Sequence, residues 1–213
     1  MRKVLASLFL SLDGVMQAPG GPDEDPSGGF ELGGWIAPHA DETTGAAIGE
    51  LFSEPFDLLL GRRTYDIFAR YWPGLDADSA EQPLPEMTLN IARLFNRATK
   101  YVATHSPETL TWENSRGLGT DVPAAVRQLR QADGPNLLIQ GSSQLIQTLL
   151  AHGLIDELRL LIFPVLLGRG RRLFGTDAIP AALRLTRSAT SGTGVILATY
   201  ERAGDVPTGL AGR

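Results

Sequence analysis

Apolar residues recur at two different spacings along most of this 213-residue chain. Short, almost continuous apolar runs occur at Lys3–Leu12, at Phe56–Leu60 and in the sequence PNLLIQ, and such runs are typical of strands buried in a parallel sheet. Between these runs, apolar residues return at helical spacing, as at Ile48, Leu51 and Phe52. Alternating strands and helices predict an α/β fold, doubly wound around a mostly parallel sheet.

The spacing changes to that of β-structure from Asp156 onward. Three strand-like segments follow, DELRLLIF, LRLTRSAT and VILATYER, and the turn SGTG joins the last two. We expect these two to form an antiparallel C-terminal hairpin at one edge of the sheet. No composition shift marks a linker, so we predict a single domain over residues 1–203 and a flexible tail over residues 204–213.

Turn and capping residues predict where the other elements begin and end. Asp41 and Asp121 are placed to cap helices, and Gly153 follows the end of another. The segment Gly14–His39 is rich in Gly, Pro and Asp, and its length favours a functional loop. The proline-rich, acidic segment Trp72–Pro85 is predicted to be a surface loop.

Composition excludes several classes of function. The chain has 24 acidic and 19 basic residues, so its net charge of -5 gives no general attraction to nucleic acid or to an anionic membrane. It has no cysteine, which excludes disulfides and thiolate chemistry, and its three histidines lack metal-ligand spacing. The N-terminal apolar run is broken by Ser7, Ser11 and Asp13, so we interpret it as a strand and expect a soluble, cytoplasmic protein.

The sequence LLLGRRTYDIF joins a predicted strand to a predicted helix. Backbone N–H groups and the helix dipole favour an anion at such a point. Gly61 permits a sharp turn there, and Arg62, Arg63 and Thr64 would add charged and hydroxyl hydrogen bonds. This set of donors indicates a phosphate site.

A second join of the same kind occurs in LLIQGSSQLI, where Gly141, Ser142 and Ser143 lie between an apolar run and a helix start. It lacks the full three-glycine dinucleotide fingerprint. Two such joins in one α/β domain nevertheless suit a ligand with more than one phosphate, such as a dinucleotide.

Both joins also have a purely structural alternative. One arginine of the first could be solvated while the other pairs with Asp66 or Asp57. At the second, Ser142 or Ser143 could simply cap its helix.

Four segments, SLDGVM, LLLGRRTYDIF, IQGSSQLIQTLL and GLIDELRLLIFPVLLGRGRRLF, together resemble the dihydrofolate reductase-like superfamily. Within it, they resemble the branch of the C-terminal reductase domain of bifunctional riboflavin-biosynthesis deaminase-reductases, and the resemblance runs from Val4 to Glu201. It implies a doubly wound sheet with an antiparallel edge that binds NADPH across the carboxyl ends of its strands.

The resemblance assigns cofactor roles to two sets of residues. The family's glycine-arginine-x-threonine turn, which contacts the cofactor's phosphates, corresponds to Gly61, Arg62, Arg63 and Thr64. The family's glycine turn under the pyrophosphate corresponds to Gly141, Ser142, Ser143 and Gln144.

Two further segments are implicated in the same way. Thr104, His105 and Ser106 correspond to the hydroxyl loop that meets the adenosine ribose and its 2'-phosphate, which favours NADPH over NADH. Asp13 and Gly14 correspond to the turn that leads into the loop over the nicotinamide.

Folate reductases carry a catalytic carboxylate on their first helix. An ungapped count places Gly45 at that position, and the nearest carboxylates are Asp41 and Glu42, about one turn earlier. These two are the candidate catalytic residues. Each has a structural alternative, Asp41 as the N-cap and Glu42 as a favourable first-turn charge.

The run GRGRRLF contains Arg169, Arg171 and Arg172. These arginines could bind a substrate phosphate, or they could form a solvated turn or a subunit contact.

We predict an NADPH-dependent reductase of a small heterocyclic or sugar-derived C=N or C=O substrate, similar to dihydrofolate reductase or to 5-amino-6-(5-phosphoribosylamino)uracil reductase. The chain lacks a deaminase zinc motif, so a reductase domain alone is expected. The alternative is a nucleotide-binding protein that has lost the reaction and acts as a sensor or scaffold. A homodimer is expected in either case, because the apolar segment LRLLIFPVLL exceeds what one sheet edge needs.

Overall fold

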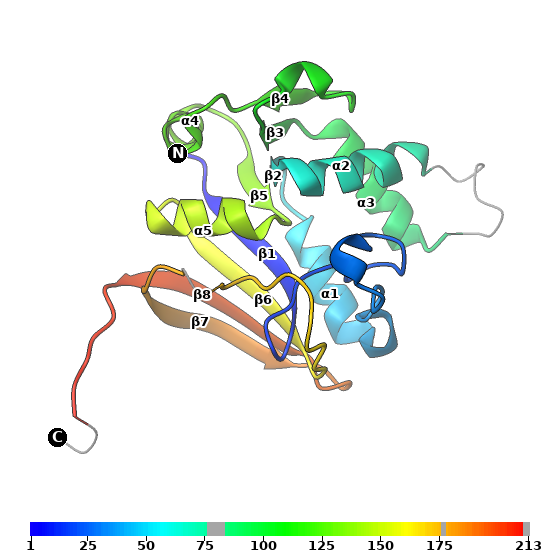
Figure 1. Ribbon diagram of the computed structural model, residues 1–213, viewed down its shortest axis with the longest axis vertical. Coiled ribbons are helices and arrows are strands. Elements are labelled where there is room, and N and C mark those ends of the chain that lie inside the picture. The colour runs from blue at the N-terminus through cyan, green and yellow to red at the C-terminus, as the bar shows by residue number, and fades with distance from the viewer. Residues whose placement is uncertain (76–83, 176–177, 211–213) are drawn as a thin grey trace.

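An eight-stranded sheet forms the centre of the part of the chain that the structure describes (Figure 1). The structure is a computed structural model that describes residues 1–75, 84–175 and 178–210. The strands are β1 (Val4–Ser11), β2 (Phe56–Gly61), β3 (Lys100–Ala103), β4 (Ser115–Gly117), β5 (Asn136–Ile139), β6 (Glu157–Phe163), β7 (Ala182–Thr190) and β8 (Ile196–Gly204). The α-helices are α1 (Glu42–Leu51), α2 (Arg62–Tyr71), α3 (Glu86–Arg97), α4 (Val122–Gln131) and α5 (Ser143–Ala151), and short 3-10 helices are η1 (Ser27–Gly29), η2 (Ala37–His39), η3 (Trp72–Gly74) and η4 (Pro107–Thr109).

The strand order is β4-β3-β2-β5-β1-β6-β8-β7. The pairs from β4 to β6 are parallel, and β6–β8 and β8–β7 are antiparallel. The predicted mostly parallel sheet with an antiparallel hairpin at its edge is therefore confirmed. The carboxyl ends of β3, β2, β5 and β1 lie side by side, which is where doubly wound sheets bind ligands.

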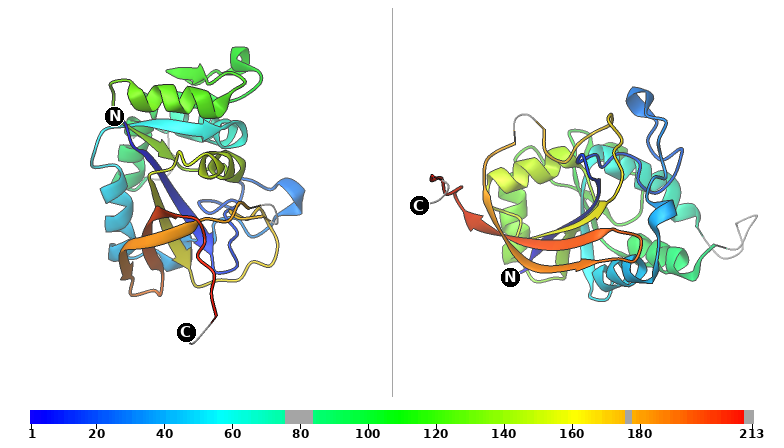
Figure 2. Two further views of the ribbon diagram at one scale, coloured as in Figure 1. Left: turned by 90° about the vertical axis from the view of Figure 1, so that its left-hand side faces the viewer. Right: turned by 90° about the horizontal axis from the view of Figure 1, so that it is seen from below.

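Helices cover both faces of the sheet (Figure 2). On β1, Val4, Ala6 and Leu8 are buried in one cluster with side chains of α4 and α5. Leu5 and Phe9, at the odd-numbered positions of β1, pack into the clusters on the opposite face, toward α1, α2 and α3. This alternation follows from the two-residue period of a strand, and burial on both faces explains why the central strands are mostly apolar.

The loop Gly14–His39 is anchored in the core although it contains only short helical turns. Trp35 is buried against Phe163, and its Nε1 donates to the backbone oxygen of Gln17 at 2.8 Å. Gln17 Nε2 in turn donates to the backbone oxygen of Asp25 at 2.9 Å. The loop is therefore held by side chains within it, and this positions its acidic segment.

Two predicted loops differ in detail from the structure. The segment after β3 contains β4, which pairs with β3 in the register Lys100↔Ser115. Its three residues show no apolar alternation, so the pattern did not indicate a strand. The predicted loop Trp72–Pro85 begins with η3, and its residues 76–83 lie outside the described part of the chain.

The chain after β8 has neither helix nor strand from Asp205 to Leu210 and extends away from the body (Figures 1 and 2). In the described ranges, no helix combines the length and apolar character that crossing a bilayer requires.

Candidate functional site

A cleft of about 1740 Å³ lies at the carboxyl end of the parallel strands. Its walls come from the N-termini of α2 and α5, from the loop after β3, from α1 and α3, and from the acidic part of the Gly14–His39 loop. A concave site of this size at the point where the strand order reverses is the expected location for a ligand.

The two strand-to-helix joins meet in this cleft because β2 and β5 are neighbours. A Cβ atom built on Gly61 would lie 2.0 Å from Ser142 Oγ, and one built on Gly141 would lie 2.9 Å from Thr64 Oγ1. Gly141 also has a φ of 126°, which disfavours any side chain. The glycines thus let the two turns pack directly against each other.

The N-termini of α2 and α5 have no side-chain cap. In contrast, Asp41 caps α1 and Asp121 caps α4 by accepting from backbone N–H groups. The alternative in which Ser142 or Ser143 caps its helix is therefore wrong. Uncapped N–H groups at two adjacent helix ends leave donors for an anionic ligand.

Arg62 bridges α2 to the loop after β3. Its Nε donates to both carboxylate oxygens of Asp66, at 2.8 and 3.0 Å. Its Nη1 donates to Thr109 Oγ1 at 2.5 Å and lies 3.4 Å from Thr104 Oγ1. The predicted alternative pairing with Asp66 is confirmed for this arginine. The same contacts bring a guanidinium next to the hydroxyl loop.

Arg63 points toward the Gly14–His39 loop. Its Nε and Nη2 donate to the carboxylate of Asp25 at 3.0 and 2.7 Å, and Arg171 pairs with the same carboxylate. Asp25 is 5% exposed. Sequence reasoning did not find Asp25, because its partners are 38 and 146 positions away and no local motif marks it.

Most of the predicted cofactor residues line the cleft. The lining includes Gly61, Arg62, Arg63, Thr64, Thr104, His105, Ser106, Gly141, Ser142, Ser143 and Gln144. Asp13 and Gly14 do not line it. Three of the four predicted segments, which are separate in sequence, are therefore brought together in the cleft, while the cofactor roles of these residues stay predictions.

Asp13 instead ties the end of β1 to the loop after β6. Its carboxylate accepts from Ser11 Oγ at 2.7 Å and from the backbone N–H groups of Leu167 and Gly168 at 3.1 and 2.9 Å. The hydrogen bond from Ser11, with those from the backbone, holds the pKa of Asp13 well below its usual value. The structure thus gives this carboxylate a role in joining two loops.

The two candidate catalytic carboxylates lie outside the cleft lining. Asp41 forms a capping box with Thr44, and the hydrogen bond from the Thr44 N–H lowers the pKa of Asp41. Glu42 is exposed in the first turn of α1. Asp41 therefore acts as the N-cap and Glu42 as a first-turn charge, as in the structural alternatives. Instead of these carboxylates, Ile48 and Leu51 of α1 and its C-cap residue Phe52 line the cleft.

The acidic residues that do line the cleft are Asp23, Glu24, Asp25 and Asp66. Asp25 and Asp66 are paired with arginines. Glu24 accepts a hydrogen bond from the Gly20 N–H at 2.6 Å, and burial raises the pKa of its carboxyl above the usual value. A carboxyl of this kind holds a proton more readily than a solvated one. Sequence reasoning did not single it out.

The three arginines of GRGRRLF have separate partners. Arg169 pairs with Glu31 and Arg172 with Asp13, and neither lines the cleft. Arg171 lines the cleft and pairs with Asp25. The described residues contain no group of His, Asp or Glu side chains that could hold a metal ion.

The sequence profile of the RibD C-terminal domain matches residues 2–197. The chain belongs to this family. Among relatives, it is 24% identical over 203 residues to the uncharacterised protein YyaP of Bacillus subtilis (strain 168), covering 93% of this chain and 94% of that protein. Family membership supports a reductase-type, oxidoreductase function.

Two solved structures show the fold. A diaminohydroxyphosphoribosylaminopyrimidine deaminase/5-amino-6-(5-phosphoribosylamino)uracil reductase from Thermotoga maritima aligns with a TM-score of 0.58 and 16% identity, over 95% of this chain and 57% of that one. Dihydrofolate reductase from Enterococcus faecalis, in complex with NADP(H), aligns with a TM-score of 0.56 and 14% identity, over 94% and 96%. The fold is that of the dihydrofolate reductase-like proteins, as the sequence motifs indicated.

Proposed function

We propose that this RibD C-terminal domain protein is an NADPH-dependent reductase of a C=N or C=O group in a small heterocyclic or sugar-derived substrate. The observation that carries the proposal is the pair of uncapped helix N-termini, α2 and α5, which meet through Gly61 and Gly141. A dinucleotide presents two phosphates close together, and this arrangement offers two adjacent sets of backbone donors.

The residues present fit such a cofactor. Thr64 and Ser142, at the glycine turns, would hold the pyrophosphate. Arg62, next to Thr104, would hold the 2'-phosphate of the adenosine ribose together with Ser106. These contacts support NADPH over NADH as the cofactor.

When bound, the nicotinamide supplies the hydride. The chain's own contributions are orientation of the ring, exclusion of water and delivery of a proton. Glu24 suits the last of these, because it lines the cleft and its raised pKa favours a protonated carboxyl. In this proposal Glu24 replaces Asp41 and Glu42, the candidate catalytic carboxylates of the sequence analysis, as the proton donor.

Titration of the purified protein with NADPH and with NADH, followed by calorimetry, tests the cofactor. We expect NADPH to bind more tightly, and Thr64→Ala to weaken its binding by about 1–3 kcal/mol. The matched control is Thr186→Ala, which removes a hydroxyl on β7, outside the cleft lining. Equal Kd values for NADPH in the Thr64→Ala variant and the wild type would refute the phosphate assignment.

A second measurement separates the reductase from the alternative. Oxidation of NADPH with a panel of carbonyl and imine acceptors is expected to be faster at pH values below the pKa of Glu24, and Glu24→Gln should remove that dependence. Tight NADPH binding without turnover of any acceptor would favour a nucleotide-binding sensor or scaffold.

A further inference from the structure

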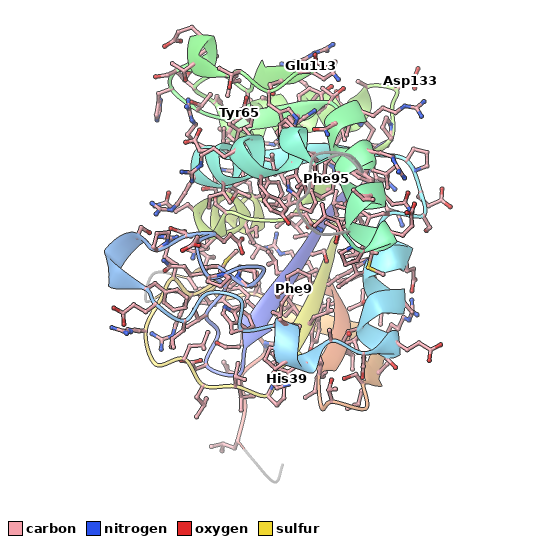
Figure 3. The ribbon with its side chains drawn as sticks, turned by 90° about the vertical axis from the view of Figure 1, so that its right-hand side faces the viewer. Phe9, His39, Tyr65, Phe95, Glu113 and Asp133 are labelled. Atoms are coloured by element: carbon pink, nitrogen blue, oxygen red, sulfur yellow. The ribbon has the colours of Figure 1, made fainter. Side chains whose placement is uncertain are left out.

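One arm of the cleft is lined by apolar and aromatic side chains from α1, α2, η3 and α3. The rings of this region contact one another: Phe95 lies 5.5 Å from Phe52, 5.6 Å from Phe68 and 5.0 Å from Trp72, measured between ring centroids. Figure 3 shows Phe95 on α3 above Phe9 on β1, with α1 beside them. We call this region the aromatic arm, and its lining includes Ile48, Phe52, Phe68, Trp72, Met87 and Ile91.

The aromatic arm and the helix N-termini differ in charge. Arg62, Arg63 and Arg171 also line the cleft, but they come from the N-terminus of α2 and from the chain after β6, and they pair with Asp66 and Asp25.

Within the described part of the aromatic arm, the charged lining residue is Arg70. Its side chain is exposed, and its Nε donates to the backbone oxygen of Asp66 at 3.2 Å. The first helix supplies no carboxylate to the arm, since Asp41 and Glu42 lie outside the cleft lining. Among the described residues, the aromatic arm therefore offers no cluster of cations for a phosphate, and α1 contributes no carboxylate to grip a charged heterocycle.

We propose that the aromatic arm binds an uncharged, flat, largely apolar ring compound, and that this is the class of substrate whose C=O or C=N group is reduced. The proposal rests on the reductase function above. It narrows the range of substrates, because it excludes a phosphorylated sugar conjugate. The physical reason is desolvation: a phosphate placed against these rings would lose water without gaining a partner, whereas a flat ring would bury apolar surface and stack on aromatic neighbours.

The uncharged bicyclic ketone chromone and the anion ribose 5-phosphate are suitable probes. Calorimetric titration of each, with and without saturating NADPH, measures the preference of the aromatic arm. We expect chromone to bind at least about tenfold more tightly than ribose 5-phosphate, because an anion has no cation cluster to pair with there.

Two matched variants on α3 locate the binding. Met87 lines the arm and is 43% exposed, and Leu94 is 37% exposed but does not line the cleft. Met87→Glu should weaken chromone binding by about tenfold or more, because a carboxylate would then border the ring, whereas Leu94→Glu should leave it unchanged. Both positions are partly solvated, so both variants should fold; Ile48→Ser provides a second, uncharged perturbation of the arm.

The result can be separated from that of the proposed function. Chromone binding that depends on Met87 supports the aromatic arm even if NADPH does not bind, in which case the reductase function fails by itself. A chromone Kd no lower than that of ribose 5-phosphate, or one unchanged by Met87→Glu, overturns the substrate class even if NADPH binds normally.

Discussion

Arg63 donates two hydrogen bonds to the buried carboxylate of Asp25, which also pairs with Arg171. The pair links the acidic part of the Gly14–His39 loop to the N-terminus of α2, so the predicted phosphate-binding arginine is already fixed in direction by a partner. An oriented guanidinium loses less side-chain entropy when it binds a ligand.

Asp25→Asn is expected to lower the free energy of unfolding by about 1–3 kcal/mol, because two arginines lose a charged acceptor. Urea denaturation measures this change. The matched control is Asp66→Asn, which removes an exposed pair with Arg62 and should change the free energy by less than about 1 kcal/mol. If both substitutions lowered the free energy of unfolding equally, the pairing of Asp25 with the arginines would stabilise the protein no more than an exposed ion pair does.

Gly61→Ala is expected to destabilise the protein by about 1–3 kcal/mol, because the new methyl group would overlap the Ser142 side chain. The backbone at Gly61 has φ -74° and ψ 154°, which alanine adopts freely, so crowding alone is tested.

Ser142→Gly should rescue the Gly61→Ala variant, since the nearest remaining atom would be the Ser142 nitrogen at 3.7 Å. Gly49→Ala in α1, where a Cβ meets nothing within 4 Å, serves as control and should not destabilise. A double variant no more stable than Gly61→Ala would argue against direct packing of the two turns.

Thr104→Glu is expected to weaken NADPH binding about tenfold more than NADH binding, because the added carboxylate would face the 2'-phosphate that only NADPH carries. The position follows from Arg62, whose Nη1 lies 3.4 Å from Thr104 Oγ1. Thr104→Gln controls for side-chain size. If Thr104→Glu weakened the binding of NADPH and NADH equally, the 2'-phosphate would not bind next to this loop.

Lys100 is fully buried, with its Nζ 4.2 Å from the Trp112 ring centroid and donating to the backbone oxygens of Asn96 and Ala98. Desolvation by burial lowers the pKa of this amine from 10.5 to about 8. Between these two pH values the unfolded chain binds more protons than the folded protein, so the free energy of unfolding should rise with pH.

We expect an increase of about 1–2 kcal/mol between pH 8 and pH 9.5, measured by urea denaturation at each pH. Lys100→Met should abolish this slope. A wild-type stability that stays level or falls over the same interval would mean that the buried amine keeps its usual pKa.

Several features of the fold could be predicted from single segments. The buried strands, the capped starts of α1 and α4 and the β7–β8 hairpin depend on periodicity and on turn chemistry within a few residues. The three-residue strand β4 carried no such signal, because its pairing with β3 is what makes it a strand.

The sequence by itself determined the fold class, the family motifs and the residue types at the two glycine turns. Only the tertiary structure decided that Gly61 meets Ser142, that Asp25 holds Arg63, and that Glu24 lines the cleft while Asp41 and Glu42 do not. The physical reason is the distance along the chain over which each interaction acts. Strand period, capping and turn chemistry act between neighbours in the chain, whereas a cleft is made by side chains whose distances depend on the order in which the strands pack.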